Sequence, residues 1–487
     1  MASDGLKVTI IGGGLAGALA ARVLRENHSV TVLERAREAV EAGAAINVGP
    51  NGTRILSELN FDPKKVGSIA VGTTRTWDKE GNKLQEMDVN FEEEYGAPWY
   101  FQHRADLRAE FLRLASAPSD ELGIKGQPAV IRFGENVVDV DVESGIVTLA
   151  SGEKIDSDLV VAADGVKSMV RPLIVGDKAF ETARPSGLSA FRFTLPREEA
   201  LQVSPEIRIL DKSKPAMLEM VFAFDPSKRS VVMYPCRNYE LLNIVVIAPD
   251  TILKAEATEF WSAPGDREEM LSCFEDYPSW VLDLLKLGKD MKLWQLRDQD
   301  PLPSYIKGRT VLIGDAAHAM TPHQGQGGTQ AVEDAEGFRL FNQAGVSRDH
   351  VSEILADFDS VRRPRASQIQ DNTRKAAEKR TAEDAYYFAK YNWTYPGIVE
   401  GLRRFMKFHI LPSVKVTGAV NTPLSKVVAW RYLVPGRGTS YTTQIVSTKH
   451  GESNRPSGGG GRVLESTLNR ENIRTSARDA ILWRPAQ

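Results

Sequence analysis

Short hydrophobic runs of strand length recur along this chain, and each ends at glycine or at an acidic residue. Four of them are Lys7 to Ile11, Val30 to Leu33, Leu159 to Ala163 and Thr310 to Ile313. Such nearly continuous runs are typical of strands that are buried on both faces, as in a parallel sheet. Three of them lead to an acidic residue: Glu34 and Asp164 follow directly, and Asp315 follows after one glycine. The pattern therefore predicts a parallel α/β sheet with carboxylates at its strand ends.

The first run leads into a glycine turn and an alanine- and leucine-rich helix, predicted over 12–27. Gly12, Gly14 and Gly17 match the spacing GxGxxG, and Glu34 follows about 20 residues later, at the end of the next strand. The glycines allow a tight turn and close approach of pyrophosphate, and the acid accepts hydrogen bonds from ribose hydroxyls. An acid there also repels a 2′-phosphate, so the turn predicts FAD or NAD. The alternative is a glycine-tolerant turn in an unrelated α/β unit.

The stretch 308–335 has the layout of a second ligand-binding segment. Its strand ends on Gly314-Asp315, passes through a proline- and glycine-rich loop and enters a helix near Gly328 or Thr329. Glycines let the backbone approach a ligand closely, and a helix N-terminus favours negative charge. An ordinary strand–loop–helix connection is the alternative.

Residues 179–294 differ in character, because they are rich in strand patterns and lack glycine-rich loops. The predicted strands are LSAFRFTL, EIRIL, MLEMVFAF, SVVMY and ELLNIVVIA. They predict a separate antiparallel sheet inserted into the α/β domain. Arg192 lies on the strand face opposite Phe191 and Phe193, and Tyr234 ends its strand before a proline. A structural ion pair for Arg192 and simple packing for Tyr234 are equally good interpretations.

The remaining segments are mainly helical in pattern. A glycine-containing loop at 43–50 precedes a helix from about Asn51, and Arg104 stands before a helix that Asp106 favours electrostatically; Arg104 contacts a ligand or is solvated. Residues 351–390 are predicted to be helical with a break at Pro364, and 391–434 to form a helical appendage. Beyond Pro435 the composition is linker-like, which predicts a flexible tail.

Composition narrows the choice of compartment and partner. The chain has 487 residues, which suggests two or three domains, and a net charge of −3, which gives no field for nucleic acid or anionic lipid. Its two cysteines, Cys236 and Cys273, form neither a disulfide framework nor a metal-ligand spacing. No apolar run approaches the length of a spanning helix, and no signal peptide is evident. We therefore expect a cytoplasmic protein without metal.

Three motifs in this order, GGGLAG with Glu34, AADGVKS and GDAAHAMTPHQGQGGTQAVEDA, resemble the single-component flavoprotein aromatic hydroxylases, or class A flavin monooxygenases. The resemblance covers about Leu6 to Ala377 and is greatest to the salicylate-hydroxylase-like branch; ARPSGLSAFRF is also similar to fungal natural-product monooxygenases. It implies an α/β fold with a Rossmann-like FAD-binding domain in two parts, 1–178 and 295–377. The β-sheet substrate domain would be 179–294, the helical appendage 378–435 and the tail 436–487.

The resemblance also implies the cofactor contacts. Residues matching Gly12, Gly14, Gly17, Glu34 and Arg104 hold the ADP half of FAD; Asp164 matches the DG motif near the cofactor, and Asp315 a residue that binds the ribityl hydroxyls. The loop through Gly327 would lie against the flavin. The further implied FAD-binding residues are Leu15, Ala16, Arg35, Ala45, Gly314, Pro322, Gly325, Gly328 and Thr329.

The implied reaction uses NADH or NADPH and O2 to hydroxylate or epoxidise an electron-rich aromatic, indole-like or olefinic molecule through a flavin C4a-hydroperoxide. Only one GxGxxG is present, so the nicotinamide cofactor would bind transiently. Arg192 and Tyr234 match residues that act on the substrate in relatives, but Ser230 replaces a histidine that serves some of them as a base. This favours a larger natural product over salicylate or hydroxybenzoate. A flavin reductase, a non-catalytic escort, and either a monomer or a homodimer remain open.

Overall fold

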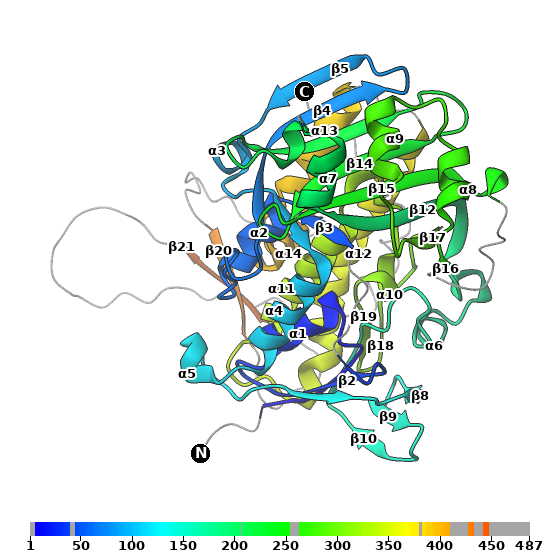
Figure 1. The fold of residues 1–487 in the computed structure, drawn as a ribbon. Helices are drawn as coiled ribbons and strands as arrows, with labels where there is room; N and C mark the ends of the chain where they lie inside the picture. Colours follow the sequence, from blue (N-terminus) through cyan, green and yellow to red (C-terminus); the bar gives the residue numbers. More distant parts are fainter. Residues whose placement is uncertain are drawn as a thin grey trace, which may run out of the picture. The chain divides into compact units, whose positions relative to one another are not determined.

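The computed structural model describes residues 5–38, 44–205, 207–253, 263–378, 382–409, 427–432 and 442–447. The chain divides into two units, Met1–Pro412 and Ser413–Gln487. In the second unit, the described residues form one antiparallel strand pair, β20 (Val427–Tyr432) with β21 (Thr442–Ser447). All other described elements belong to the first unit (Figure 1).

A six-stranded sheet forms the base of the first unit, in the order β18-β19-β11-β1-β2-β7. All its pairings are parallel except that between β18 and β19 at one edge. The four runs predicted as buried strands are all in this sheet, which confirms them. The strand bounds are β1 (Lys7–Ile11), β2 (Ser29–Glu34), β7 (Val130–Phe133), β11 (Leu159–Ala162), β18 (Ile306–Lys307) and β19 (Thr310–Leu312).

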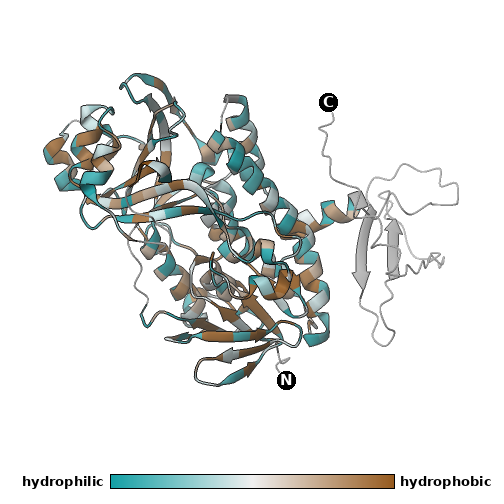
Figure 2. Cartoon of the chain, turned by 90° about the vertical axis from the view of Figure 1, so that its right-hand side faces the viewer, coloured by the Kyte–Doolittle hydropathy of each residue, from teal (hydrophilic) through white to brown (hydrophobic). Residues whose placement is uncertain are grey.

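Hydrophobic cores cover both faces of this sheet. On β11, Leu159 and Val161 pack into one core with helices α1, α4, α11 and α12, while Val160 and Ala162 pack into another. Figure 2 shows the hydrophobic residues concentrated along the strands. Because both faces are covered, nearly every position of these strands is apolar, as the sequence showed. The helices are α1 (Leu15–Leu24), α4 (Arg104–Ser116), α11 (Gly327–Gly337) and α12 (Val351–Glu378).

A ten-stranded sheet lies beside the α/β part (Figure 1). Its order is β16-β17-β12-β15-β14-β13-β4-β6-β3, with β5 paired to β4. The strand bounds are β3 (Ala45–Val48), β4 (Ile69–Asp78), β5 (Lys83–Asp88), β6 (Tyr100–His103), β12 (Arg184–Pro196), β13 (Ala216–Phe222), β14 (Ser230–Cys236), β15 (Leu241–Pro249), β16 (Ala263–Pro264) and β17 (Lys292–Asp298).

This sheet corrects two details of the sequence analysis. It is mixed, because β13 pairs with β4 in parallel, and four of its strands come from residues 45–103 rather than from 179–294. The segment EIRIL is not a strand: its last three residues form the 3₁₀ helix η2 (Arg208–Leu210), with Ile209 and Leu210 buried in the hydrophobic core of the large sheet. The division into five domains stays a prediction.

The helix break predicted at Pro364 was also wrong. Helix α12 continues through Pro364, because Arg362 and Arg365 on either side are anchored to Glu333. The segment predicted as a helical appendage contains α13 (Ala382–Trp393) and α14 (Ile398–His409) but also strand β20, and β21 lies within the predicted flexible tail. Both strands use β-branched residues, which favour extended backbone. The remainder of the tail lies outside the described residues.

Smaller elements connect these layers. They are α2 (Pro50–Ser57), α3 (Phe91–Tyr95), α5 (Ser119–Leu122), β8 (Val137–Asp141), β9 (Ile146–Leu149), β10 (Lys154–Asp156), α6 (Arg171–Val175), η1 (Lys178–Phe180), α7 (Arg197–Val203), η3 (Asp250–Ile252), α8 (Arg267–Ser272), α9 (Ser279–Leu285), α10 (Asp315–His318), η4 (Pro322–Gln324), η5 (Phe338–Phe341) and η6 (Arg348–His350). Of the helices that the structure describes, none is long and apolar enough to cross a membrane.

Candidate functional site

The carboxyl ends of β1, β2, β11 and β19 meet at one edge of the parallel sheet, because these strands run in the same direction. Backbone hydrogen bonds continue the pairing into the loops: Gly12 N–H donates to Leu33 O at 2.8 Å, and Ile313 N–H to Ala162 O at 3.0 Å. The glycine turn, Glu34, Asp164 and Asp315 therefore lie along one edge, as predicted. In open α/β sheets, ligands bind at this edge.

The glycine turn needs glycine at two of its positions and leaves room at the third. Gly12 has φ +102°, and a Cβ there would lie 2.3 Å from Ala163 O. A Cβ at Gly17 would lie 2.0 Å from Gly12 O, so helix and strand pack closely. At Gly14 a Cβ would meet no atom within 4 Å. That open space beside the N-terminus of α1 fits a phosphate group.

Glu34 is held in place by the turn and by a helix that sequence analysis did not connect to it. Its carboxylate accepts hydrogen bonds from Gly13 N–H at 2.9 Å and Ala36 N–H at 2.8 Å. Arg108 on α4 donates to Glu34 at 3.2 Å and to Gly13 O at 2.8 Å. Arg108 thus fixes the turn and the acid together. Arg35 was predicted to contact the cofactor. Its side chain is exposed, and the contact stays a prediction.

The Gly314-Asp315 turn lies against the glycine turn. Gly314 has φ +60°, and a Cβ there would lie 2.9 Å from the Cβ of Ala16. Asp315 begins α10 with an exposed side chain, whereas Ala16 and its neighbour Leu15 are buried in α1. Burial lowers the pKa of Arg104, and the nearby Asp315 carboxylate partly offsets this. Two segments about 300 residues apart in the chain thus share one edge with Arg104.

Arg171 connects the turn after Asp164-Gly165 with the turn at Gly314-Asp315 through backbone carbonyl groups. Its guanidinium, fully buried, donates to Ala316 O at 2.7 Å, to Asp315 O at 3.0 Å and to Val166 O at 3.0 Å. A planar guanidinium with five donors suits such a set of acceptors. Arg171 was not predicted, because its partners are backbone atoms and two of them, at Asp315 and Ala316, are distant in sequence.

Asp164 has one satisfied and one unsatisfied carboxylate oxygen. Oδ2 accepts hydrogen bonds from Met169 N–H at 2.9 Å and Val170 N–H at 3.3 Å, while the buried Oδ1 has no partner among the described residues. Burial raises the pKa of Asp164, and hydrogen bonds from Ser168 and the backbone act in the opposite direction. A buried acceptor without a partner is costly. A ligand hydroxyl would satisfy it, so the residues fit the predicted FAD.

The loop 322–329 rests on strand β3. A Cβ at Gly325 would lie 2.7 Å from the side-chain amide of Asn47, and one at Gly328 would lie 2.5 Å from Ile46. Thr329 Oγ1 accepts a hydrogen bond from Gly49 N–H at 3.3 Å. Pro322 begins η4, and at Gly327, the first residue of α11, a Cβ would meet no atom within 4 Å. The loop is therefore open at Gly327, and the flavin contact there stays a prediction.

Buried charges anchor this loop from behind. Asp334 accepts hydrogen bonds from Gly314 N–H at 2.8 Å, from His318 Nε2 at 2.6 Å and from Arg362 Nε at 2.9 Å. Glu333 pairs with Arg362 and with Arg365. Although burial alone would raise them, the pKa values of Glu333 and Asp334 are lowered by these cationic partners. The helix that follows the loop is thereby fixed to α12.

Arg192 and Tyr234 lie on the same face of the large sheet. On β15, Arg192 pairs with Val245 and Tyr234 pairs with Asn243, two residues away on the same face. The opposite face carries the hydrophobic core that includes Phe193. Burial lowers the pKa of Arg192, which Tyr234 partly offsets, and Arg192 Nε has no partner among the described residues. Among the described residues, no carboxylate ion pair of Arg192 is present.

Tyr234 is buried between the sheet and the loop. Its ring stacks on Phe101 with centroids 4.5 Å apart. Burial raises the pKa of Tyr234 far above its usual value, and Arg192 and a hydrogen bond with Asn47 act to lower it. Asn47 thus contacts both Tyr234 and the segment at Gly325. Ser230 is buried as well. It lies two residues before Val232 on β14, so its side chain is on the same strand face as that of Tyr234.

A cleft of about 390 Å³ lies beside β12, whose residues 192–196 line it from both faces of the sheet. Arg192 and Thr194 from β12 line it together with Lys292 and Trp294 from β17 and Ala44 beside β3. Ala45, predicted to contact the cofactor, follows Ala44 and donates its N–H to Asn243 Oδ1 at 3.0 Å. The cleft therefore reaches from solvent to Arg192.

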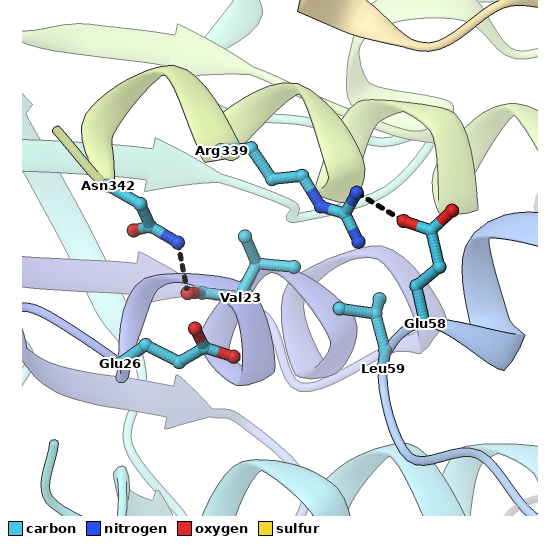
Figure 3. A pocket seen from close by; sticks show the side chains of 6 residues that line it. All are labelled: Val23, Glu26, Glu58, Leu59, Arg339 and Asn342. Carbon is cyan, nitrogen blue, oxygen red and sulfur yellow. Dashed lines mark hydrogen bonds and ion pairs between the residues drawn. The ribbon is translucent and has the colours of Figure 1, made fainter. Parts of the chain in front are cut away.

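A second hollow, of about 310 Å³, is unrelated to this edge (Figure 3). It lies between α1, α2 and η5, where Arg339 pairs with Glu58 at 2.5 Å and Asn342 donates to Val23 O at 3.3 Å. Val23 is nine residues from Gly14 along α1, so the hollow is roughly 13 Å from the glycine turn. Its polar groups already satisfy one another.

Comparison with known proteins agrees with this geometry. A family model described as FAD binding domain matches residues 5–373. FAD-dependent monooxygenase cfoG of Aspergillus candidus is 33% identical over 377 residues, covering 76% of this chain and 84% of the relative. Hispidin-3-hydroxylase of Neonothopanus nambi is 29% identical over 377 residues, covering 75% and 87%. A solved salicylate hydroxylase substrate complex has a TM-score of 0.65 at 25% identity, covering 82% and 98%.

Proposed function

Because this chain belongs to the FAD binding domain family and is an FAD-dependent monooxygenase, we propose that it oxygenates an electron-rich aromatic or olefinic small molecule. The overall reaction consumes NAD(P)H, a proton and O2, and yields the substrate with one added oxygen atom, NAD(P)+ and water. One observation carries this proposal: the polar face with Arg192 and Tyr234 lies against the loop at Gly325, to which Asn47 connects it.

FAD, when bound, supplies hydride acceptance and O2 activation, for which no protein side chain is suited. The residues of the sheet edge would hold it: Glu34 would accept hydrogen bonds from the ribose, and the space beside Gly14 would take the pyrophosphate. Asp164 Oδ1 is an acceptor in need of a donor. The N–H groups at the start of α11 would favour negative charge placed beside Gly327.

Arg192 and Tyr234 would orient the substrate by hydrogen bonds to one of its oxygen atoms. Arg192 brings a buried donor without a partner in the described chain, and an oxygen with partial negative charge would satisfy it. The raised pKa of Tyr234 keeps its hydroxyl protonated at neutral pH, so it can donate to that oxygen. A phenol or an enol is therefore the substrate class that this face favours.

Ser230 makes simple hydroxybenzoate chemistry less favourable. A serine does not accept a proton near neutral pH, so the substrate must react as bound or ionise without a base at this position. Hispidin-3-hydroxylase and cfoG are fungal relatives, and we propose a fungal-type secondary metabolite rather than salicylate. Hydroxylation and epoxidation are both compatible with this face.

The direct test is a substrate screen with purified yellow protein, NADH or NADPH, and 18O2. Mass spectrometry should detect the gain of one labelled oxygen atom with a phenolic or olefinic compound. Product without label would instead indicate a reductase. A colourless protein, or one that never incorporates label with any electron-rich ring or alkene, would contradict the proposal.

Two substitutions separate cofactor binding from turnover. Asp315→Ala should lower the FAD content, because Asp315 lies at the strand-end edge near Arg104. Arg192→Ala should leave FAD bound and lower product formation on the order of a hundredfold, the loss typical of one oxyanion donor. FAD content comes from the absorbance spectrum and product from mass detection. Normal turnover by Arg192→Ala would show that its assigned role is wrong.

A further inference from the structure

One row across the large sheet brings together three polar residues from adjacent strands. In the antiparallel register, Asn243 on β15 pairs with Thr194 on β12 and with Tyr234 on β14. Residues directly opposite each other in antiparallel strands point to the same face, with Cβ atoms about 5 Å apart. Asn243 therefore stands between the strand of Arg192 and the strand of Tyr234, on their face of the sheet.

The orientation of the Asn243 side chain is fixed by one hydrogen bond. Ala45 N–H can only donate, and it lies 3.0 Å from the side-chain oxygen of Asn243. The amide nitrogen Nδ2 consequently points away from Ala45. This residue is fully buried, and Nδ2 has no hydrogen-bond partner within the described ranges of the chain. A buried donor left unsatisfied costs free energy, so a partner is expected when the site is in use.

The neighbours of Asn243 on the large sheet are near the cleft that Arg192 lines. Thr194, its partner on β12, and Ala44, next to its partner Ala45, both line the cleft of about 390 Å³. Arg192 lines the same cleft, with its Nε also lacking a partner in the described chain. Asn243 itself does not line the cleft; it lies beside Thr194, on the sheet face that carries Arg192 and Tyr234. Two buried donors without partners in the described chain thus share the face assigned to the substrate.

We propose that Asn243 is a substrate-binding residue whose Nδ2 donates a hydrogen bond to a phenolic or carbonyl oxygen of the aromatic substrate. This inference rests on the proposed function and assigns that site a third donor beside Arg192 and Tyr234. An amide does not titrate, so its contribution to selectivity for an oxygenated ring holds at every assay pH. A hydrocarbon ring of the same size leaves the donor unsatisfied and binds more weakly.

The test measures discrimination between 2-naphthol and naphthalene by the FAD-loaded protein. Quenching or enhancement of flavin fluorescence gives the dissociation constant of each probe without turnover. The wild-type protein should prefer 2-naphthol. Asn243→Asp keeps the acceptor for Ala45 N–H but removes the donor, and should lower this preference roughly tenfold. Asn243→Leu removes the donor without adding charge and should lower it as well.

Gln102→Glu on β6 is the matched control. Gln102 is also a fully buried amide of this sheet, with Nε2 donating to Ser68 at 2.9 Å. It follows Phe101, so it points away from the face on which Phe101 stacks on Tyr234. The preference for 2-naphthol should be unchanged in this variant. FAD content and melting temperature identify any variant that fails to fold.

An unchanged preference in Asn243→Asp would overturn the proposal, as would a wild-type protein that binds both probes equally or binds neither. Failure of the proposed function has a different signature. In that case the wild-type protein forms no labelled product with any substrate, whereas the binding preference and its loss in Asn243→Asp are still measurable.

Discussion

At the scale of single residues, three of the buried polar atoms without partners in the described chain lie at the candidate site. Asp164 Oδ1 lies at the cofactor edge, and Arg192 Nε and Asn243 Nδ2 at the substrate face. Each such atom costs about 1–3 kcal/mol in the protein without its ligand. Similar atoms, among them Arg22 Nε and Arg75 Nε, lie elsewhere in the molecule, so it is the position of these three at the sheet edge and on the face of Arg192 that makes them candidates for ligand contacts.

Asp164→Asn should stabilise the FAD-free protein but weaken FAD binding. Burial raises the pKa of Asp164 above its value in the unfolded chain, about 3.9. Its contribution to stability is therefore fully present below the unfolded pKa and is lost as the pH rises through the folded pKa. Replacing the carboxyl by an amide removes this loss. We expect a gain in unfolding free energy at pH 7 and a smaller gain at pH 4.

Thermal melting at the two pH values measures this gain, and a flavin titration measures the weaker binding. The amide keeps an acceptor for Met169 N–H but presents a donor where Oδ1 stood. Asp139→Asn is the control, because Asp139 is exposed and should change neither quantity. A larger gain at pH 4 than at pH 7 would contradict the explanation.

At the scale of elements, the loop that faces the predicted flavin is supported by helix α12, which no motif had indicated. Arg362 connects α12 to Glu333 and Asp334 on α11, and Asp334 in turn holds the backbone of Gly314. The same contacts keep α12 helical across Pro364, where the ring removes one backbone hydrogen bond. Tertiary ion pairs here outweigh the local preference of proline.

Arg362→Lys should therefore destabilise the fold and lower FAD retention. Lysine keeps the charge but lacks the planar fork that bonds both carboxylates, which leaves a fully buried pair partly unsatisfied. We expect a loss of about 3–5 kcal/mol in unfolding free energy. Denaturant unfolding measures it, with flavin fluorescence reporting release of FAD.

Arg363→Lys is the matched control on the neighbouring position. Arg363 pairs with Asp359 at 2.9 Å, and about a third of its side chain is exposed, 32%. Such pairs contribute about 0–1 kcal/mol, so this variant should unfold close to the wild-type protein. Equal losses in both variants would show that the buried network is not the cause.

The sequence predicted features whose contacts are close along the chain and missed those whose contacts join distant segments. The glycine turn with Glu34, and the strand ends at Asp164 and Asp315, were predictable because each is a local pattern of strand, turn and acid. Arg171 and Asn243 were not, because their roles come from pairings between distant segments. The segment EIRIL was misread for a related reason, since packing of Ile209 and Leu210 made it a 3₁₀ helix.

At the scale of the whole molecule, the region of family resemblance is smaller than the folded unit. The family model ends at residue 373, whereas the first unit extends to Pro412. Beyond residue 373, Tyr395 and Ile398 are buried in the main core, and Asn392 donates to Gln324 Oε1 in η4 at 2.7 Å. Helices α13 and α14 are thus part of the folded protein, and α13 contacts the loop beside the predicted flavin through Asn392.

Two truncations test this extent of the unit. A chain ending at Pro412 keeps the whole first unit, so we expect its FAD content and melting temperature to remain close to those of the full chain. A chain ending at Glu378 loses Tyr395 and Ile398 from the core and frees Glu336, which accepts a hydrogen bond from Ile398 N–H at 2.9 Å. Losing large buried side chains costs several kcal/mol, so the shorter chain should melt well below the longer one and retain little FAD. Flavin absorbance per protein and thermal melting measure both effects. A chain ending at Glu378 that binds FAD as well as the longer one would show that the family region alone forms the cofactor site.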